Sequence, residues 1–413
     1  MPKKTAQLSD SCQEVLAKKY RKKTELATHS LQQALKTSTC IFLLMTAKQA
    51  VQDILSLAKI TLDGKKPWDI HINDERLYQR VLAQGSLGLG DAYIDGWWDC
   101  PHLDQFFEKI LSSRLDEKAK NWKTALRVLK ARAFNLQSRR KAFEIGEQHY
   151  DIGNDLYTAM LDKRMTYTCG YWKHAKNLDA AQEAKLDLVC KKIGLKKGQR
   201  VLDIGCGWGS FAKYAAEKYG AQVVGITVSK EQVALAKQTC KGLAVQIRLQ
   251  DYREVNEQFD HIISLGMFEH VGYKNYKTYM NMVHRCLKDK GLFLLHTIGG
   301  DKSVKTSDAW ILKHIFPNSM LPSIAQIGTA IEGLFVMEDW HNFSTDYEKT
   351  LLAWFANFEK HWPKLRKKYD ERFYRMWKYY LLSCAGLFRA RNAQLWQIVL
   401  SKNGVRNGYV SLR

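Results

Sequence analysis

The alternation of short apolar runs with helical stretches between residues 200 and 299 restricts the fold of this chain more than any other feature. The apolar runs are RVLDIGC (200–206), QVVGITV (222–228), VQIRLQD (245–251), FDHIISLG (259–266) and GLFLLHTIG (291–299). Strands that alternate with helices form βαβ units, and such units build a parallel sheet. We therefore predict an α/β fold with a mostly parallel sheet, to which QLWQIVLS (394–401) adds a last strand.

The N-terminal third of the chain has a different pattern and predicts a smaller α+β domain. We expect a helix (AVQDILSLAK), a hairpin (ITLDGKKPWDIHI, turning at Asp63-Gly64) and a second helix (ERLYQRVLAQ). No strand precedes the glycines of GSLGLGDAYIDGWWD (85–99), so we interpret them as turn and packing residues rather than as a phosphate loop.

The net charge is the strongest signal in the composition. A formal charge of +22 favours a polyanionic partner, which is either a nucleic acid or an anionic membrane surface. Residues 118–143 contain nine basic residues and no acid, and Trp122, Leu126, Leu129 and Ala133 recur among them at helical spacing. This pattern is typical of a membrane-surface helix, and equally of a packed helix with a solvated basic face.

Several classes of protein are excluded by what the sequence lacks. The apolar run CIFLLM (40–45) is far too short to span a membrane, and MPKKTAQLSD lacks the apolar core of a signal peptide. The nine cysteines show neither a CxxC pair nor a zinc spacing. We therefore expect reduced thiols in a cytoplasmic protein, and no metal site.

The segment VLDIGCGWGS (201–210) predicts a cofactor site, because it reads as a strand, a glycine-rich turn and a helix. Glycine lets the backbone approach a ligand where a Cβ would collide. The spacing G-x-G-x-G, with Asp203 two residues before the first glycine, differs from the dinucleotide fingerprint G-x-G-x-x-G. It resembles motif I of class I S-adenosylmethionine methyltransferases, in which Asp203 would lie near the cationic methionine moiety.

The ends of the next two strands complete the expected cofactor site. Asp251 ends the third strand, where such enzymes contact adenine. The second strand usually ends near an acid for the ribose, but it reads GITVSKEQ here, so Thr227 and Gln232 are expected to replace it. The full set expected to bind the cofactor is Tyr167, Thr168, Asp203, Gly205, Cys206, Gly207, Gly209, Thr227, Gln232, Gln250 and Asp251.

The segment after the fourth strand bears on the methyl acceptor. Enzymes that methylate amino groups of bases carry a Pro-Pro-aromatic segment there, whereas this chain reads LGMFEHVG and has no Pro-Pro pair. The Pro-Cys nucleophile of cytosine C5 enzymes is also missing. Both observations argue against a nucleic-acid substrate.

A series of motifs extends the resemblance over about residues 46 to 410. The motifs are QGSLGLGDAYIDGWWD, EQHYDIGNDLY, MTYTCGYW, VLDIGCGWGS, GITVSKEQ, GMFEHVG, LHTIG, EDWHNF and CAGLFRAR, in that order. Together they resemble the bacterial cyclopropane-fatty-acyl-phospholipid synthases. These enzymes transfer the methyl group of S-adenosylmethionine to a cis double bond in a phospholipid acyl chain.

The resemblance implies an organisation and a set of partners. The fold would be a class I methyltransferase, with a Rossmann-like seven-stranded sheet, helical insertions and the smaller N-terminal domain. We expect a homodimer that acts on unsaturated phospholipids from the inner face of the cytoplasmic membrane, attached peripherally. The expected divisions are an appendage (1–44, helical or without fixed structure), a lipid-associated domain (45–132), a linker (133–146) and a catalytic domain (147–413).

The resemblance also implies catalytic residues. Attack of the alkene on the methyl group gives a carbocation, which needs a dry, electron-rich pocket and finally a base. By resemblance that base is bicarbonate, and Glu269 would point toward the cofactor's methyl region and orient it, while His270 supports the loop. The residues that hold bicarbonate would be Cys169, Glu269, His296, the backbone of Ile298, and Tyr347. Cys384 also matches a residue of the family, and we favour packing near the acyl channel over covalent catalysis for it.

Two alternatives remain at this stage. The first is a basic module for binding membranes or nucleic acid on a vestigial methyltransferase fold, against which the intact Asp203, Asp251 and Glu269 argue. The second is methylation of the acyl chain without ring closure, which motif I does not distinguish. The full set of base-holding residues favours the ring.

Overall fold

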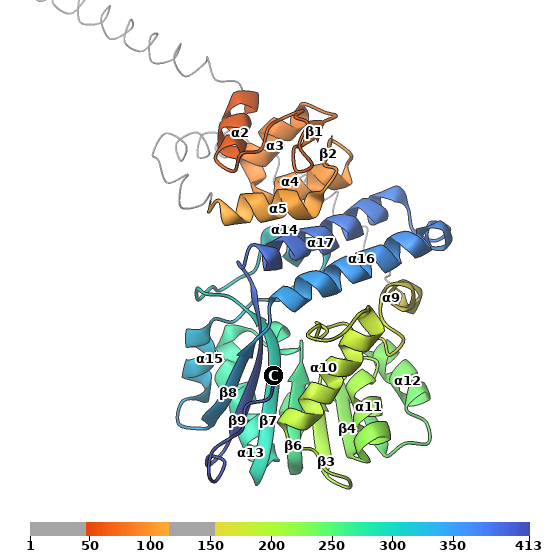
Figure 1. Ribbon diagram of the computed structural model, residues 1–413, viewed down its shortest axis with the longest axis vertical. Helices are drawn as coiled ribbons and strands as arrows, with labels where there is room; N and C mark the ends of the chain where they lie inside the picture. The colour runs from red at the N-terminus through yellow and green to blue at the C-terminus, as the bar shows by residue number, and fades with distance from the viewer. Residues whose placement is uncertain (1–46, 115–152) are drawn as a thin grey trace, which may run out of the picture. The chain divides into compact units, whose positions relative to one another are not determined.

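The computed structural model describes residues 47–114 and 153–413, and contacts between residues divide the chain into a unit of 1–53 and a unit of 54–413 (Figure 1). The predicted boundaries after residues 44, 132 and 146 fall outside the described residues. The basic segment 118–143 also falls outside them. The division into an appendage, a lipid-associated domain, a linker and a catalytic domain therefore stays a prediction.

A seven-stranded sheet forms the centre of the larger unit, with the order β5-β4-β3-β6-β7-β9-β8. β3 to β7 pair in parallel with one another, whereas β9 runs antiparallel to both β7 and β8. The prediction of a mostly parallel sheet is confirmed. The strands are β3 (Arg200–Ile204), β4 (Gln222–Thr227), β5 (Val245–Leu249), β6 (Phe259–Leu265), β7 (Leu287–Gly299), β8 (Val336–Asn342) and β9 (Gln394–Ser401).

Helices cover both faces of this sheet because successive residues of a strand point to opposite faces. In β3, Val201 joins an apolar cluster with residues of α10 (Leu178–Lys192) and α11 (Ser210–Tyr219). Its neighbour Leu202 joins a second cluster, with residues of α13 (Tyr276–Cys286) and α15 (Ile324–Ile331). α12 (Lys230–Thr239) follows β4 and contributes Ala236 to the first cluster.

The order of the strands creates a crevice at the carboxyl end of β3. The chain passes from β3 to β4 on one side, and later returns to place β6 on the other side of β3. Ligands of open α/β sheets bind at such a switch point, outside the carboxyl ends of the strands. The fold therefore directs the search for a site to the turns after β3, β4 and β6.

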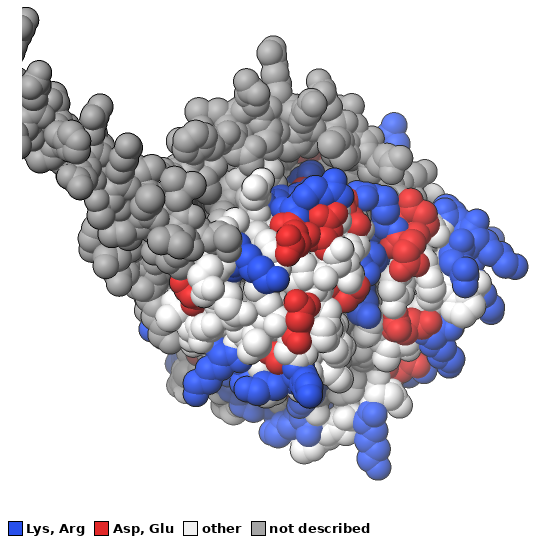
Figure 2. Space-filling model, turned by 90° about the horizontal axis from the view of Figure 1, so that it is seen from above, with Lys and Arg blue, Asp and Glu red and all other residues white. Residues whose placement is uncertain are grey.

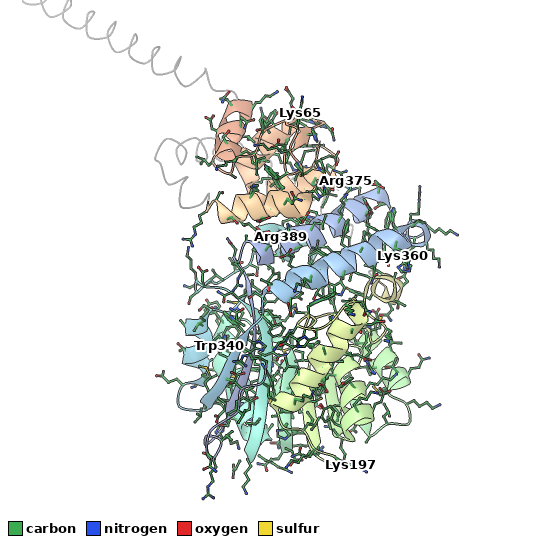
Figure 3. The ribbon with its side chains drawn as sticks, in the orientation of Figure 1. Lys65, Lys197, Trp340, Lys360, Arg375 and Arg389 are labelled. Atoms are coloured by element: carbon green, nitrogen blue, oxygen red, sulfur yellow. The ribbon has the colours of Figure 1, made fainter. Side chains whose placement is uncertain are left out.

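Two long helices, α16 (Thr345–Leu365) and α17 (Glu371–Arg389), pack against each other, and α17 also contacts the N-terminal helices. At Gly386 an added Cβ would lie 2.5 Å from the backbone oxygen of Asp104, so a glycine is needed where α17 meets α5 (Leu103–Ser112). Arg389, labelled in Figure 3, lies at the end of α17. It forms ion pairs with Asp104, Glu108 and Glu348. α9 (Asn154–Met160) packs on α16.

The N-terminal part of this unit contains α3 (Arg76–Gln84), α4 (Ser86–Ile94), α5 and a two-stranded sheet, and α2 (Ala47–Ser56) precedes it. β1 (His71–Ile72) pairs with β2 (Trp98–Asp99), so the predicted hairpin at Asp63-Gly64 is wrong. The Asp69 carboxylate accepts backbone N–H bonds from Thr61 and Lys66, both at 2.9 Å, and closes a loop where a ladder was expected.

The glycines of 85–99 are turn and packing residues, as predicted. Gly85 has φ +59° and joins α3 to α4, whereas Gly90 lies inside α4. An added Cβ on Gly90 would lie 2.4 Å from the Trp310 ring, so the glycine permits close contact with α14 (Ala309–His314).

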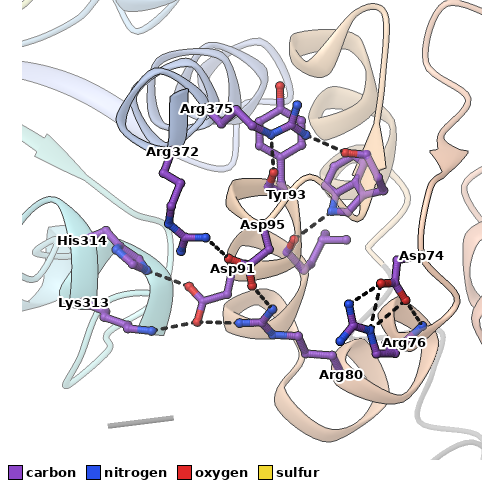
Figure 4. A network of polar contacts seen from close by, with 12 residues as sticks. Asp74, Arg76, Arg80, Asp91, Tyr93, Asp95, Lys313, His314, Arg372 and Arg375 are labelled. Atoms are coloured by element: carbon purple, nitrogen blue, oxygen red, sulfur yellow. Dashed lines mark hydrogen bonds and ion pairs between the residues drawn. The ribbon is translucent and has the colours of Figure 1, made fainter. Parts of the chain in front are cut away.

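A polar network reinforces the contact between α4 and α14 (Figure 4). The buried Asp91 of α4 accepts a bond from Lys313 at 2.8 Å, and its other oxygen lies 2.7 Å from His314 Nε2. Burial alone would raise the pKa of Asp91, but the bonds from His314 and Lys313 hold it below its ordinary value.

No helix within the two described stretches is long and apolar enough to cross a membrane.

Candidate active site

A cavity of about 690 Å³ lies at the carboxyl ends of β3, β4 and β6, where the strand order predicts a ligand site. Its walls include the glycine-rich turn after β3, the ends of β4 and β5, and the loop after β6. Most of the expected cofactor residues line it: Tyr167, Thr168, Asp203, Gly205, Cys206, Gly207, Thr227, Gln232, Gln250 and Asp251.

The glycine-rich turn is held in a shape that only glycine adopts easily. Gly205 and Gly207 have φ values of +80° and +54°. The backbone N–H groups of Gly205 and Cys206 donate to the Ile226 oxygen at 2.9 and 3.0 Å, which fixes the turn against β4. An added Cβ on Gly207 would meet no protein atom within 4 Å, so this backbone is open to a ligand.

Gly209, which was expected in the cofactor set, does not line the cavity. Its φ of +84° begins α11, and an added Cβ would lie 3.1 Å from Cys240 Sγ and 3.3 Å from the Ala236 Cβ. The reason for this glycine is therefore the close packing of α11 against α12.

Asp203 carries the polar group best suited to a cation. It is buried, and its Oδ2 has no hydrogen-bond partner among the residues that the structure describes. Burial raises the pKa of Asp203 to about 7, although the charge of Lys185 acts in the opposite direction. A cation bound beside Asp203 would favour its ionised form.

The far side of the cavity brings Thr227 and Gln232 together, as the sequence predicts. Thr227 Oγ1 donates to Gln232 Oε1 at 2.7 Å. Asp251 pairs with Arg253 through two bonds of 2.8 Å, and these bonds lower the pKa of Asp251. Arg253 also lines the cavity, and its place was not predicted.

Glu269 lies behind the cavity wall, on the short 3₁₀ helix Phe268–His270. Its Oε1 accepts the backbone N–H of Ile298 at 2.7 Å, and its Oε2 has no partner among the described residues. Burial raises the pKa of Glu269 to about 7. His270, expected only to support the loop, lines the cavity instead, because the bond to Ile298 in β7 turns Glu269 away.

His296 of β7 is buried and, like Asp203 and Glu269, has a polar atom without a partner among the described residues. Its Nδ1 lies 3.4 Å from Gln397 Nε2, whereas its Nε2 has no partner among the described residues. Burial, assisted by the charges of Lys185 and Lys192, lowers the pKa of His296 well below its ordinary value. His296 is therefore neutral, and a donating Gln397 amide leaves its proton on Nε2.

Cys169 and Tyr347 approach the same region. Cys169 Sγ donates to the Gly170 oxygen at 3.1 Å and lies 3.8 Å from Thr350 Oγ1, one turn along α16 from Tyr347. Burial raises the pKa of both Cys169 and Tyr347 well above the ordinary value, so neither ionises near neutral pH. Tyr380, Cys169, Glu269 and Cys384 all lie near enough to the Tyr347 phenol to act on it electrostatically.

Cys384 on α17 is not an activated thiol. Burial raises its pKa to about 12, and a nucleophilic cysteine needs the opposite shift. The structure is consistent with the packing role that we favoured. The 690 Å³ cavity is not lined by Cys384, nor by Cys169, Glu269, His296 or Tyr347.

Some residues of the site have no counterpart in the sequence prediction. Trp208 lines the cavity, donates from Nε1 to Asn154 at 3.0 Å, and packs on Tyr157 with ring centroids 4.8 Å apart. Lys185 of α10 is fully buried and donates to Thr168 Oγ1 at 2.7 Å. The available signal was its position four residues after Ala181 and four before Val189, on the apolar face of its helix.

The family model described as mycolic acid cyclopropane synthetase matches residues 137–398. The chain is 54% identical to the cyclopropane-fatty-acyl-phospholipid synthase of Escherichia coli (strain K12) over 357 residues, covering 86% of this chain and 93% of that protein. Among solved structures, the cyclopropane synthase MmaA2 from Mycobacterium tuberculosis has a TM-score of 0.58 and 31% identity, covering 63% of this chain and 98% of that one. The mycolic acid cyclopropane synthase CmaA1, complexed with SAH and CTAB, has a TM-score of 0.57 and 32% identity over the same shares.

Proposed function

The chain belongs to the mycolic acid cyclopropane synthetase family, and on this premise we propose that it converts cis double bonds of phospholipid acyl chains into cyclopropane rings. S-adenosylmethionine supplies the added carbon. The observation that carries the proposal is the similarity to the Escherichia coli enzyme along nearly the whole length of both chains.

The 690 Å³ cavity is the proposed site of S-adenosylmethionine, which supplies an electrophilic methyl group when bound. Two observations support the fit. The unpartnered carboxylate oxygen of Asp203 suits a sulfonium cation, and the open backbone at Gly207 permits close approach of the ligand. Thr227, Gln232, Gln250 and Asp251 would hold the ribose and adenine, while Tyr167 and Thr168 line the opposite wall.

We propose that bicarbonate is the base, held by Cys169, Glu269, His296 and Tyr347. In the ionised form of Glu269 the unpartnered Oε2 is an acceptor, and the unpartnered His296 Nε2 is a donor. Bicarbonate has both an acidic hydroxyl and acceptor oxygens, so it matches this pair, whereas a simple anion would match only the donor. Ile298 acts through Glu269, since its N–H already donates to that carboxylate.

The aromatic side chains around the cavity are proposed to assist the carbocation. Tyr167, Trp208 and Phe316 line the cavity, and an aromatic face stabilises a cation without adding to it. Burial also keeps the phenol of Tyr347 protonated, so that it is a hydrogen-bond donor and not a competing nucleophile.

The proposed partners are unsaturated phospholipids at an anionic membrane surface, with the protein as a homodimer on the inner face of the cytoplasmic membrane. The net charge of +22 supports an anionic surface. Figure 2 shows one face of the molecule, on which Lys and Arg side chains are spread widely with Asp and Glu among them.

Mass spectrometry of phospholipids tests the proposal. After incubation with labelled S-adenosylmethionine, unsaturated chains should gain one CH2 with no loss in the count of rings plus double bonds. Methylation without ring closure can give a branched alkene of equal mass, so proton NMR of the ring protons must accompany the mass. If the lipids stayed unchanged and RNA in the same incubation took up the label from S-adenosylmethionine, the proposal would be overturned.

A further inference from the structure

Lys185 has a burial that the chemistry described so far does not explain. Its side chain is 0% exposed, and its Nζ donates to Thr168 Oγ1 at 2.7 Å. Among the described residues no carboxylate lies within 4.0 Å of this nitrogen. Burying an ammonium group without a partner of opposite charge is costly.

The other buried lysine of the same helix shows how such a charge is usually compensated. Lys192 Nζ lies 3.6 Å from Asp339 Oδ2 and 3.0 Å from His341 Nδ1. Asp339 is held in turn by Arg413. Lys192 therefore belongs to a structural cluster, whereas Lys185, two turns earlier on α10, has only a neutral hydroxyl as its partner.

The groups around Lys185 belong to the candidate active site. Asp162, Cys169 and Asp203 lie near enough to Lys185 to act on it electrostatically. Asp162 is occupied otherwise, since its oxygens accept the backbone N–H groups of Thr166 at 2.8 Å and Arg164 at 3.0 Å. In the other direction, the charge of Lys185 acts on His296.

The proposed bicarbonate site itself contains no cation. Cys169, His296 and Tyr347 are neutral near pH 7, because burial shifts the pKa of each away from its charged form. Glu269 is either neutral or negative. An anion bound there would add a buried negative charge. Lys185 is the positively charged group that acts on this site and has no ion-pair partner among the described residues.

We propose that the Lys185 ammonium is the counter-charge for the anion held by Cys169, Glu269, His296 and Tyr347. It is a supporting residue, because it acts through the field of its charge rather than by contact with the reacting atoms. The inference rests on the proposed function, in which that anion is bicarbonate.

The test compares two substitutions that separate charge from hydrogen bonding. Lys185→Met removes the charge and the bond to Thr168, with a side chain of similar length. Thr168→Val removes only the bond and leaves the charge in place. Thermal unfolding of each protein, without S-adenosylmethionine, is measured against bicarbonate concentration at fixed pH near neutrality, with chloride at equal ionic strength as the control. A ligand that binds only the folded state raises the melting temperature.

The parent protein and Thr168→Val should be stabilised by bicarbonate over chloride, and Lys185→Met should need at least about tenfold more bicarbonate for the same rise. In chloride alone, Lys185→Met should be as stable as the parent or more so, because replacing an uncompensated buried charge with an apolar side chain is often stabilising. A purely structural lysine would give a lower melting temperature in chloride.

Besides a lower melting temperature of Lys185→Met in chloride, three results would overturn the inference. The first is an equal response to bicarbonate in Lys185→Met and the parent, and the second is an equal loss in Thr168→Val. If Lys185→Met does not fold, Lys185→Gln takes its place with the same expectations. The third is a parent protein that responds to bicarbonate neither in melting temperature nor in activity, which would also reject bicarbonate in the proposed function. Ring formation in the lipid assay is measured separately, so failure of the enzyme activity is distinguishable.

Discussion

Replacing Glu269 by Gln should make the protein more stable and less active at the same time. Glu269 is buried, and its pKa rises from 4.5 to about 7 because burial disfavours the carboxylate. The folded state therefore binds more protons than the unfolded state between these values. Stability conferred by this group falls as the pH rises from about 4.5 to about 7, and the whole penalty is present above pH 7.

The size of the penalty follows from the same two values. A displacement from 4.5 to about 7 corresponds to about 3 kcal/mol, since one pH unit is worth about 1.4 kcal/mol. Gln keeps an oxygen that accepts the Ile298 N–H and cannot ionise. Glu269→Gln should therefore gain up to about 3 kcal/mol in its free energy of unfolding near pH 8, and almost nothing near pH 4.

The catalytic effect has the opposite sign. In the variant an amide donor replaces Oε2, the atom proposed to accept the bicarbonate hydroxyl. A hydrogen bond to a charged group contributes about 1.5–3 kcal/mol, so turnover should fall by about 10- to 150-fold while affinity for S-adenosylmethionine is kept.

Two measurements decide the matter. Urea unfolding of parent and variant near pH 4 and pH 8 gives the stability difference, and lipid mass spectrometry gives cyclopropane formation. Near-parental cyclopropane formation by Glu269→Gln would refute its role with the base. Identical pH dependence of unfolding in both proteins would refute the argument from burial. If Glu269→Gln lost activity as expected, but the activity of the parent did not depend on bicarbonate in carefully degassed buffer, Glu269 itself would be the base.

Three further predictions concern the cofactor and the membrane. Because the pKa of Asp203 is about 7, parental affinity for S-adenosylmethionine should rise as the pH increases through 7, whereas Asp203→Asn should bind weakly at every pH, as calorimetry would show. Gly205→Val should abolish calorimetric binding and lower the melting temperature, since φ is +80° and a Cβ would lie 2.7 Å from Met267 Cβ; unchanged affinity would reject the cofactor assignment. Liposome binding should rise with anionic lipid and fall with salt. Replacing three basic residues by Gln should weaken the free energy of binding, measured by sedimentation, by about 1 kcal/mol for each residue. Binding that responds neither to salt nor to these substitutions would reject the basic segment as the contact. Those three residues are Lys123, Arg127 and Lys130.

The sequence predicts those parts of the fold in which local pattern and final environment agree. The buried strands on both sides of β3 are continuous apolar runs, and their ends fall within two residues of the prediction. β7 begins four residues earlier than predicted. The prediction missed its first residues, Leu287 to Lys290, because most of them are charged and exposed. The failed hairpin near Asp63 depended on a distant side chain, Asp69, whose bonds to the backbone no period could indicate.

The site divides in the same way. Residues on the glycine-rich turn and at strand ends were predictable because the topology fixes where strands end. Trp208, although it lies in that turn, was not predicted, because a tryptophan between two glycines is also typical of ordinary packing, and Phe316 reaches the cavity from a segment with no motif. Lys185 was missed because it belongs to no motif. The sequence marks it only as a charged residue on the apolar face of a helix.

Through the network around Asp91, helix α4 helps to position one wall of the proposed cofactor cavity, although no residue of α4 lines that cavity. Asp91 binds Lys313 and His314 at the end of α14, and Ile315 and Phe316, the next two residues, line the cavity. Mutational drift in α4 is therefore constrained by the chemistry of a site that α4 never meets. A chimaera that took its N-terminal helices from a relative would therefore also change the shape of the cavity. If the residue at position 91 did not match Lys313 and His314, Phe316 would be the first cavity residue to shift.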